Sequence, residues 1–231
     1  MSANDELAEA AGRLAAVRQR IEKALADCGR APGETALLAV SKTFPASAVR
    51  AFGQAGQLAF GESYIQEARE KIPSLPDNLE WHFIGHLQTN KAKYAASLFG
   101  VLHALDSLEL AAELDRRLAR LERDMGVYVQ VNVSGEDSKS GLEPGELPAF
   151  LDSLERFGCL RPLGLMTMPP YDPDPETGRP HFARLRELRD RFCPHLKGLS
   201  MGMSDDFPVA ISEGSTIVRV GTALFGQRPR S

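Results

Sequence analysis

The chain has 231 residues, a net charge of −4, 43% hydrophobic residues and 25% charged residues. This composition excludes an intrinsically disordered chain, and without a basic block a nucleic-acid-binding protein is not expected. The length allows one α/β barrel domain or two smaller domains.

The cysteines and the first residues indicate a soluble protein in a reducing compartment. Cys28, Cys159 and Cys193 have neither metal nor redox spacing, so we expect free thiols. The first 30 residues carry Asp5, Glu6 and Glu9 and lack a long apolar core, which argues against a signal peptide. No stretch is apolar over the length of a membrane span. We therefore predict a cytoplasmic protein.

The chain begins with an amphipathic helix and then alternates between strands and helices. The helix is predicted over 4–26, because apolar residues recur on one face: Leu7, Leu14, Val17, Ile21 and Leu25. Strands are predicted over 36–41, 57–60, 80–84, 99–104, 127–133, 161–165, 197–201 and 215–220. Helices are predicted between them, over 46–55, 63–71, 88–97, 107–124, 144–157, 180–192 and 206–212.

Eight alternations of this kind predict a parallel sheet closed into a barrel. The fold class is thus α/β, a single (β/α)8 TIM barrel with an extra N-terminal helix, and one domain spans 1–231. A doubly wound open sheet is the alternative, but its five or six strands leave segments unexplained.

The first strand, a continuous apolar run, ends at Ser41 and Lys42. Ligands bind at the carboxyl ends of the strands in such barrels. A lysine there can lose its hydration and attack a carbonyl as a neutral amine. The alternative is an ordinary lysine that reaches solvent or pairs with a carboxylate.

Polar residues also follow the second and third strands. Ser63 and Gln66 have the spacing of a helix capping box. His82 and His86 are four residues apart, but without acidic or cysteine partners a metal site is not expected. We expect His82 to face the barrel interior with its hydrogen bonds satisfied.

The fifth and sixth strands end in Asn132 and in Met166. Asn132 can bond either a ligand or the backbone of its own loop. The proline-rich stretch 169–175 after the sixth strand can be neither helix nor strand interior, so we expect a surface loop.

The last two strands predict a phosphate site. In barrels, phosphate binds between the loops after strands seven and eight, where Ser204, Gly221 and Thr222 fall. Ser204 can also be a helix N-cap. Arg219 interrupts an apolar strand, so its buried charge requires a partner, either a ligand atom or a structural carboxylate. An amine, a phosphate cradle and an arginine together suit a phosphorylated carbonyl compound, of which pyridoxal 5′-phosphate is the commonest.

The order of motifs along the chain resembles that of the pyridoxal phosphate homeostasis protein family (the YggS/PROSC type). These motifs cover 39–226 and read AVSKT, GESYIQEA, WHFIGHLQTNK, VQVNVSGEDSKSG, GLMTM, LSMGMSDDF and VRVGTALFG. The resemblance implies a barrel similar to the N-terminal domain of alanine racemase.

The resemblance also implies roles for individual residues. Lys42 would form a Schiff base with the cofactor, Ser204, Gly221 and Thr222 would hold its phosphate, and Arg219 would face its pyridine nitrogen. The ring pocket would be lined by Asn132, His82, Met166 and Met201. Ser63 departs from the family, which usually has asparagine there, so the role of this side chain stays open.

The family implies a protein that buffers pyridoxal phosphate or delivers it to apo-enzymes without catalytic turnover. We expect a monomer, because the dimerising second domain of alanine racemase is not expected here. An arginine at the ring nitrogen disfavours its protonation and weakens the ring as an electron sink. Alanine racemase also uses a tyrosine from a second domain, which this sequence does not contain. The alternatives are a pyridoxal-phosphate-dependent amino-acid racemase or lyase, and a barrel enzyme in which Lys42 acts on another phosphorylated substrate.

Overall fold

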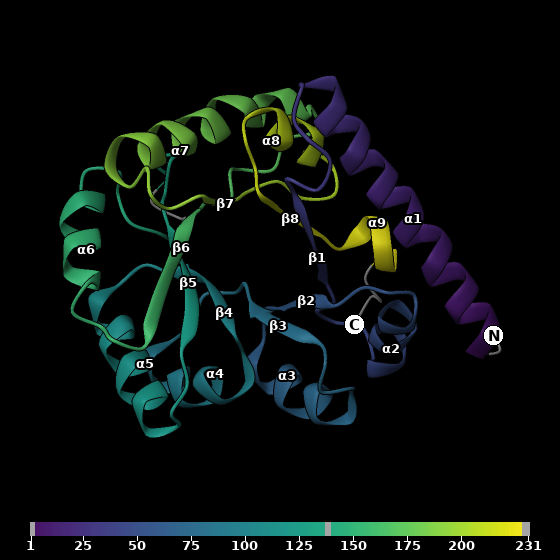
Figure 1. Cartoon of the computed structure of the whole chain (residues 1–231), viewed down its shortest axis with the longest axis horizontal. Coiled ribbons are helices and arrows are strands. Elements are labelled where there is room, and N and C mark those ends of the chain that lie inside the picture. Colours follow the sequence, from purple (N-terminus) through teal and green to yellow (C-terminus); the bar gives the residue numbers. More distant parts are fainter. Residues whose placement is uncertain (1–2, 137–139, 228–231) are drawn as a thin grey trace.

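The computed structural model describes residues 3–136 and 140–227. In these residues the strands are parallel and pair in chain order into a closed barrel, with β1 and β8 closing the ring (Figure 1). The strands are β1 (Ala36–Val40), β2 (Ala59–Glu62), β3 (Glu80–Phe83), β4 (Val101–Leu105), β5 (Met125–Gln130), β6 (Leu160–Met166), β7 (Gly198–Ser200) and β8 (Ile217–Val220). The predicted (β/α)8 barrel is confirmed.

The helices lie outside the strands and cover the barrel (Figure 1). They are α1 (Ala3–Asp27), α2 (Ala46–Gln54), α3 (Ile65–Lys71), α4 (Ala92–Leu98), α5 (Leu108–Arg120), α6 (Leu147–Leu154), α7 (Arg179–Phe192), α8 (Phe207–Ser212) and α9 (Thr222–Phe225). Single 3₁₀ turns stand at Ile72–Ser74, Thr89–Lys91 and Pro175–Gly178. The short helix α9 was not predicted, because four residues are too few to carry a helical period.

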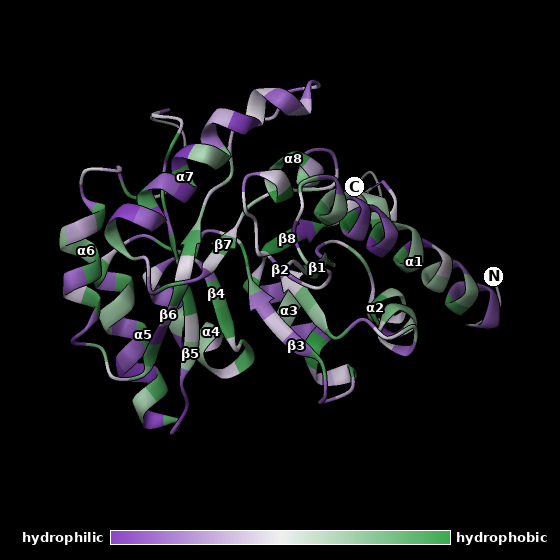
Figure 2. Cartoon of the chain, turned by 45° about the horizontal axis from the view of Figure 1, so that its top comes forward, coloured by the Kyte–Doolittle hydropathy of each residue, from purple (hydrophilic) through white to green (hydrophobic). Residues whose placement is uncertain are grey.

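The extra helix α1 packs on the outside of the barrel against α2, α8 and α9. Its inward face is the predicted apolar one: Leu14, Val17, Ile21 and Leu25 are each at most 3% exposed. Hydrophilic and hydrophobic bands alternate along this helix (Figure 2), as expected for a helix with one solvated face. The amphipathic pattern thus placed the helix correctly.

The barrel interior and the layer between strands and helices form one apolar cluster, with Phe60, Phe83 and Leu102 among its fully buried members. Strands buried on both faces read as continuous apolar runs. β1 is such a run, whereas Arg219 interrupts the run in the fully buried β8. Among the described residues, no helix has the length and the apolar character needed to cross a membrane.

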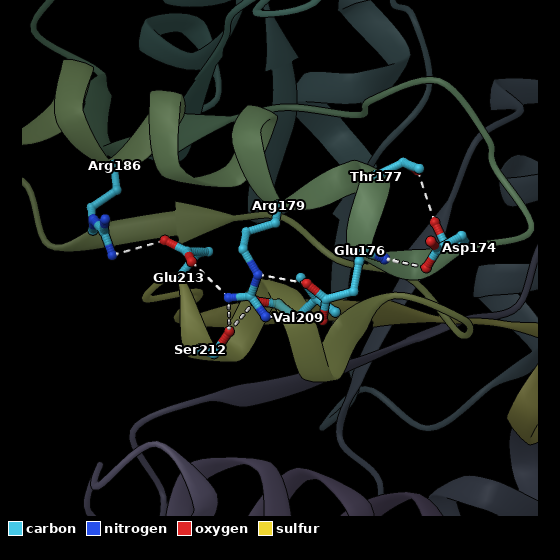
Figure 3. Close-up of polar contacts among 8 residues, drawn as sticks. All are labelled: Asp174, Glu176, Thr177, Arg179, Arg186, Val209, Ser212 and Glu213. Atoms are coloured by element: carbon cyan, nitrogen blue, oxygen red, sulfur yellow. Dashed lines mark hydrogen bonds and ion pairs between the residues drawn. The ribbon is translucent and has the colours of Figure 1, made fainter.

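Polar contacts fasten α8 to the start of α7 (Figure 3). The Arg179 guanidinium donates to Ser212 Oγ and to Glu213 Oε1, both at 2.8 Å, and also pairs with Glu176. Glu213 in turn pairs with Arg186 at 3.0 Å. The predicted loop 169–175 precedes this network and contains neither helix nor strand before Pro175. These contacts fix α8 and therefore the loop that enters it from β7.

Candidate functional site

Lys42 lies two residues after the end of β1, at the rim of the barrel where we expected it. Its half-buried amine donates a hydrogen bond to Ser63 Oγ at 3.2 Å. Ser63 directly follows β2, which pairs with β1 through Val40 and Gly61. The register of these neighbouring strands therefore brings the two side chains together, and Ser63 has a direct contact with Lys42.

The predicted capping box at Ser63 is wrong. Helix α3 begins at Ile65, its N-cap residue is Tyr64, and no side chain caps it. The backbone of Ser63 is instead packed against Gly85, where an added Cβ would lie 2.4 Å from the Ser63 carbonyl oxygen. This contact with the segment after β3 keeps Ser63 outside the helix and leaves its hydroxyl to Lys42.

Arg219 extends from β8 into the barrel and is 5% exposed. Its Nη1 donates to Ser200 Oγ at 2.7 Å and its Nη2 to the Thr167 carbonyl oxygen at 3.0 Å. Burial lowers the pKa of Arg219 to about 10, so the guanidinium remains charged at neutral pH. Within residues 3–136 and 140–227 no carboxylate is within ion-pair distance of it, although the charge of the Asp206 carboxylate raises its pKa. We considered a ligand atom or a structural carboxylate as the partner of Arg219, and no carboxylate among the described residues is hydrogen-bonded to it.

A chain of hydrogen bonds continues from Arg219 across the barrel. His103 Nδ1 lies 2.8 Å from Ser200 Oγ, and His103 Nε2 lies 2.9 Å from His82 Nδ1. Burial lowers the pKa of His82 to about 4, and burial together with the nearby His82 and Arg219 lowers the pKa of His103 well below its usual range. Both imidazoles are therefore neutral at neutral pH, and the expectation of an inward-facing His82 is confirmed, with its hydrogen bond at Nδ1.

Only the first bond of this chain has a direction fixed by its donor. A guanidinium can only donate, so Ser200 Oγ accepts from Arg219. The tautomers of the two neutral imidazoles set the direction of the bonds between Ser200 and His103 and between His103 and His82.

Sequence reasoning overlooked His103 and Ser200. His103 stands in the apolar strand Val101–Leu105 and is fully buried. A polar residue in an apolar strand is the signal that singled out Arg219, and it applies equally to His103. For Ser200 no such signal exists, because a serine at a strand end is common.

The predicted phosphate residues gather at the ends of β7 and β8. Ser204 Oγ accepts a hydrogen bond from the Ala223 backbone N–H at 3.4 Å, which joins the two loops. Gly221 is the N-cap residue of α9 and lies against β1, since an added Cβ would be 3.4 Å from the Val40 carbonyl oxygen. Thr222, the first residue of α9, is exposed.

Ser204 is not the N-cap of the helix that follows it. Helix α8 begins at Phe207 with Asp206 in the N-cap position. The Asp206 carboxylate accepts from the Met203 N–H at 2.6 Å and so closes the turn before the helix. The Ser204 hydroxyl is thereby left to the neighbouring loop.

The remaining predicted residues differ in their surroundings. Met166 and Met201 are 2% and 0% exposed, and they end β6 and follow β7. The Asn132 amide donates to the Glu136 carbonyl oxygen at 3.0 Å and to Glu143 Oε1 at 3.4 Å. We expected Asn132 to bond either a ligand or the backbone of its own loop, and the bond to the loop backbone is present.

His86 does not join His82. It is exposed and lies 3.9 Å from Asp106 Oδ2. Within the part of the chain that the structure describes, no three His, Cys, Asp or Glu side chains are placed to hold a metal ion.

Comparisons with known proteins agree on one family. The family model for the alanine racemase N-terminal domain matches residues 13–229. A pyridoxal phosphate homeostasis protein of Pseudomonas aeruginosa is 47% identical, over 94% of this chain and 95% of that protein. The protein of the same description from Aquifex aeolicus is 45% identical, over 94% and 97%.

A solved structure is similar over the same span. PipY of Synechococcus elongatus, in a structure described as having pyridoxal phosphate bound, is 38% identical with a TM-score of 0.80. The match covers 94% of this chain and 100% of that one.

Proposed function

The chain belongs to the family of pyridoxal phosphate homeostasis proteins, and we propose that it binds pyridoxal 5′-phosphate at the rim of the barrel. In this proposal Lys42 holds the cofactor through a Schiff base. The protein would buffer the cofactor or deliver it to apo-enzymes. The names of the relatives and the bound cofactor in PipY support this function.

The observation that carries the proposal is the buried guanidinium of Arg219 in the same barrel as Lys42. Its bonds to Ser200 and Thr167 use two of its five N–H donors, and both partners are neutral. An unprotonated pyridine nitrogen is an acceptor that suits such a group. A second positive charge there would be disfavoured, so Arg219 would keep the ring nitrogen unprotonated.

Residues at the barrel rim suit the phosphate and the aldehyde of the cofactor. Ser204 lies in the loop after β7, and Gly221 and Thr222 follow β8. The space between these two segments is the usual phosphate position in barrels. Lys42, beyond the neighbouring strand β1, offers the amine to the aldehyde, and Ser63 Oγ orients that amine through its hydrogen bond. His82, Met166, Met201 and Asn132 are the proposed lining of the ring pocket.

We also propose that the protein does not turn over substrate. The cofactor supplies an aldehyde for reversible condensation with amines and, when its ring nitrogen is protonated, an electron sink. Arg219 works against that protonation, so carbanion chemistry would be weakly supported. We further propose a cytoplasmic, monomeric protein with one domain.

Absorption spectroscopy tests the proposal. Wild type and the control Lys23→Ala, whose lysine is exposed on α1, are expected to give a visible band with added pyridoxal phosphate. Lys42→Ala is expected to give none, and borohydride should fix the cofactor on Lys42 as judged by peptide mass. The proposal fails if wild type gives no band. Turnover of an amino acid that Lys42→Ala abolishes would favour the racemase or lyase alternative.

A further inference from the structure

The turn that carries Lys42 has a strained backbone. The Phe44 N–H donates to the Ser41 carbonyl oxygen at 3.1 Å, so Lys42 and Thr43 are the central residues of a four-residue turn. Thr43 has a φ of +69°, a region that β-branched residues avoid. A turn with positive φ at this position normally has glycine or asparagine there. Surrounding contacts must therefore hold the turn in this shape.

A buried lysine holds the first half of the turn. Lys71, the last residue of α3, donates from Nζ to the Ser41 carbonyl oxygen at 2.9 Å. The same amine contacts Glu62 Oε1 at 2.7 Å and Glu67 Oε1 at 2.5 Å. These three contacts use all three N–H donors of the ammonium group.

The two carboxylates reach the same turn from other sides. Glu62 Oε1 also accepts from Ser41 Oγ at 2.7 Å, while Glu67 Oε1 accepts from the Thr43 backbone N–H at 2.7 Å. We call Glu62, Glu67 and Lys71 the turn clamp. Through it the residue before Lys42 and the residue after it are both bonded to charged side chains.

Burial of the clamp argues for a role beyond stability. The Glu62 and Lys71 side chains are 0% and 5% exposed. Burial raises the pKa of Glu62, while Lys71 and Ser41 lower it. A buried ion pair often contributes less to stability than apolar side chains of the same volume would. The ion pair between Glu62 and Lys71 instead fixes the geometry of the turn that bears Lys42.

We propose that Glu62, Glu67 and Lys71 are positioning residues for Lys42. The clamp holds the strained turn so that the Lys42 amine stays at the barrel rim beside Ser63. This inference rests on the proposed function. There, the neutral Lys42 amine would form a C=N bond with the aldehyde carbon, and its two protons would leave with the carbonyl oxygen as one water molecule. A loosened clamp would slow this condensation while the barrel stays folded.

The cofactor-free protein allows a first test through the Thr43 amide. Glu67→Ala removes the acceptor of this N–H, and amide hydrogen exchange at Thr43 should become about tenfold faster, as expected for loss of one hydrogen bond to a charged group. Acetylation of Lys42 by acetic anhydride, followed by peptide mass spectrometry, reports the amine itself and should change in rate. Glu70→Ala is the matched control, because Glu70 is exposed on the same helix and bonds Gln66.

The second test measures the rate at which the visible band appears on mixing with pyridoxal phosphate. Glu67→Ala and the double variant Glu62→Gln/Lys71→Met, which removes both buried charges together, should lower this rate about tenfold, whereas Glu70→Ala should not. Glu67→Gln, which retains a carbonyl acceptor, should recover part of the rate. Unchanged band formation and unchanged Lys42 acetylation in folded Glu67→Ala would overturn the inference. If wild type gives no band, the proposed function fails. The hydrogen-exchange rate at Thr43 and the acetylation rate of Lys42 then still show whether the turn clamp positions Lys42.

Discussion

His82 Nδ1 lies 2.9 Å from His103 Nε2, so two buried imidazoles from neighbouring strands share one hydrogen bond inside the barrel. A charge on His103 would lie near the Arg219 guanidinium, and a charge on His82 would be buried. The pair therefore constrains how the protein responds to acid, and the contacts around it can be tested separately.

Acid should destabilise the protein through these histidines. The folded pKa of His82 is about 4, below the value of about 6.5 in an unfolded chain, and the pKa of His103 is also lowered. Stability from His82 is thus fully present above pH 6.5 and is lost as pH falls towards 4, because the unfolded state binds the proton first. The expected loss is about 1.4 kcal/mol per pH unit for each histidine.

Urea unfolding between pH 7 and pH 5 measures this effect. His82→Gln should give a shallower dependence on pH than wild type by about 1.4 kcal/mol per pH unit. His195→Gln removes an exposed histidine and should run parallel to wild type. Parallel curves for all three proteins would contradict the buried, neutral state of His82.

Loss of the Ser200 hydroxyl should be costly. Ser200→Ala leaves a guanidinium N–H of Arg219 and the Nδ1 of His103 without their partner in a buried site. The free energy of unfolding should fall by about 2–3 kcal/mol, because an unsatisfied buried group loses its hydration without compensation. Ser153→Ala, on the exposed face of α6, should change it by less than about 0.5 kcal/mol. A change in Ser200→Ala no larger than in this control would argue against the hydrogen-bond chain.

Gly164 should not tolerate a side chain. Strands β6 and β7 approach so closely there that an added Cβ would lie 1.9 Å from the Gly198 carbonyl oxygen. Gly164→Ala should therefore lower the free energy of unfolding by about 3 kcal/mol or more, since backbone would have to move. Gly158 has no atom within 4 Å of the added Cβ, so Gly158→Ala should be nearly neutral or slightly stabilising. Thermal unfolding of the two variants side by side distinguishes these outcomes.

The network between α7 and α8 should contribute in a salt-dependent way. Glu213 pairs with Arg179 at 2.8 Å and Arg186 at 3.0 Å, but both arginine side chains are more than a third exposed. Glu213→Ala should therefore cost only about 1 kcal/mol at low salt, and less in 1 M NaCl because the charges are screened. Glu187→Ala removes a single exposed pair with Arg184 and should cost less than about 0.5 kcal/mol. An equal loss in both variants would show that the network adds nothing beyond one surface pair.

Local sequence patterns were enough for the architecture. Apolar runs alternating with amphipathic stretches predicted each strand of the barrel, and the face of α1 could be named residue by residue. The carboxyl ends of parallel strands meet at one rim, so Lys42, Gly221 and Thr222 could be assigned to that rim without coordinates.

The capping assignments failed because they depended on where a helix begins. Ser63 and Ser204 both precede helices in the sequence, yet α3 and α8 begin later than their motifs suggest. Contacts with Gly85 and with Ala223, from distant segments, engage these two residues instead.

The sequence alone indicated the eight strands and the helices other than α9, and it showed which strands carry or precede an amine, an arginine and small polar residues. These properties follow from periodicity and composition, which are local. Only the tertiary structure decided that Ser200 joins His103 to Arg219 and that Lys71 holds the turn of Lys42. Such hydrogen bonds depend on strand register and on the packing of α3 against the barrel. No local pattern records them, because their partners come from elements far apart in the chain.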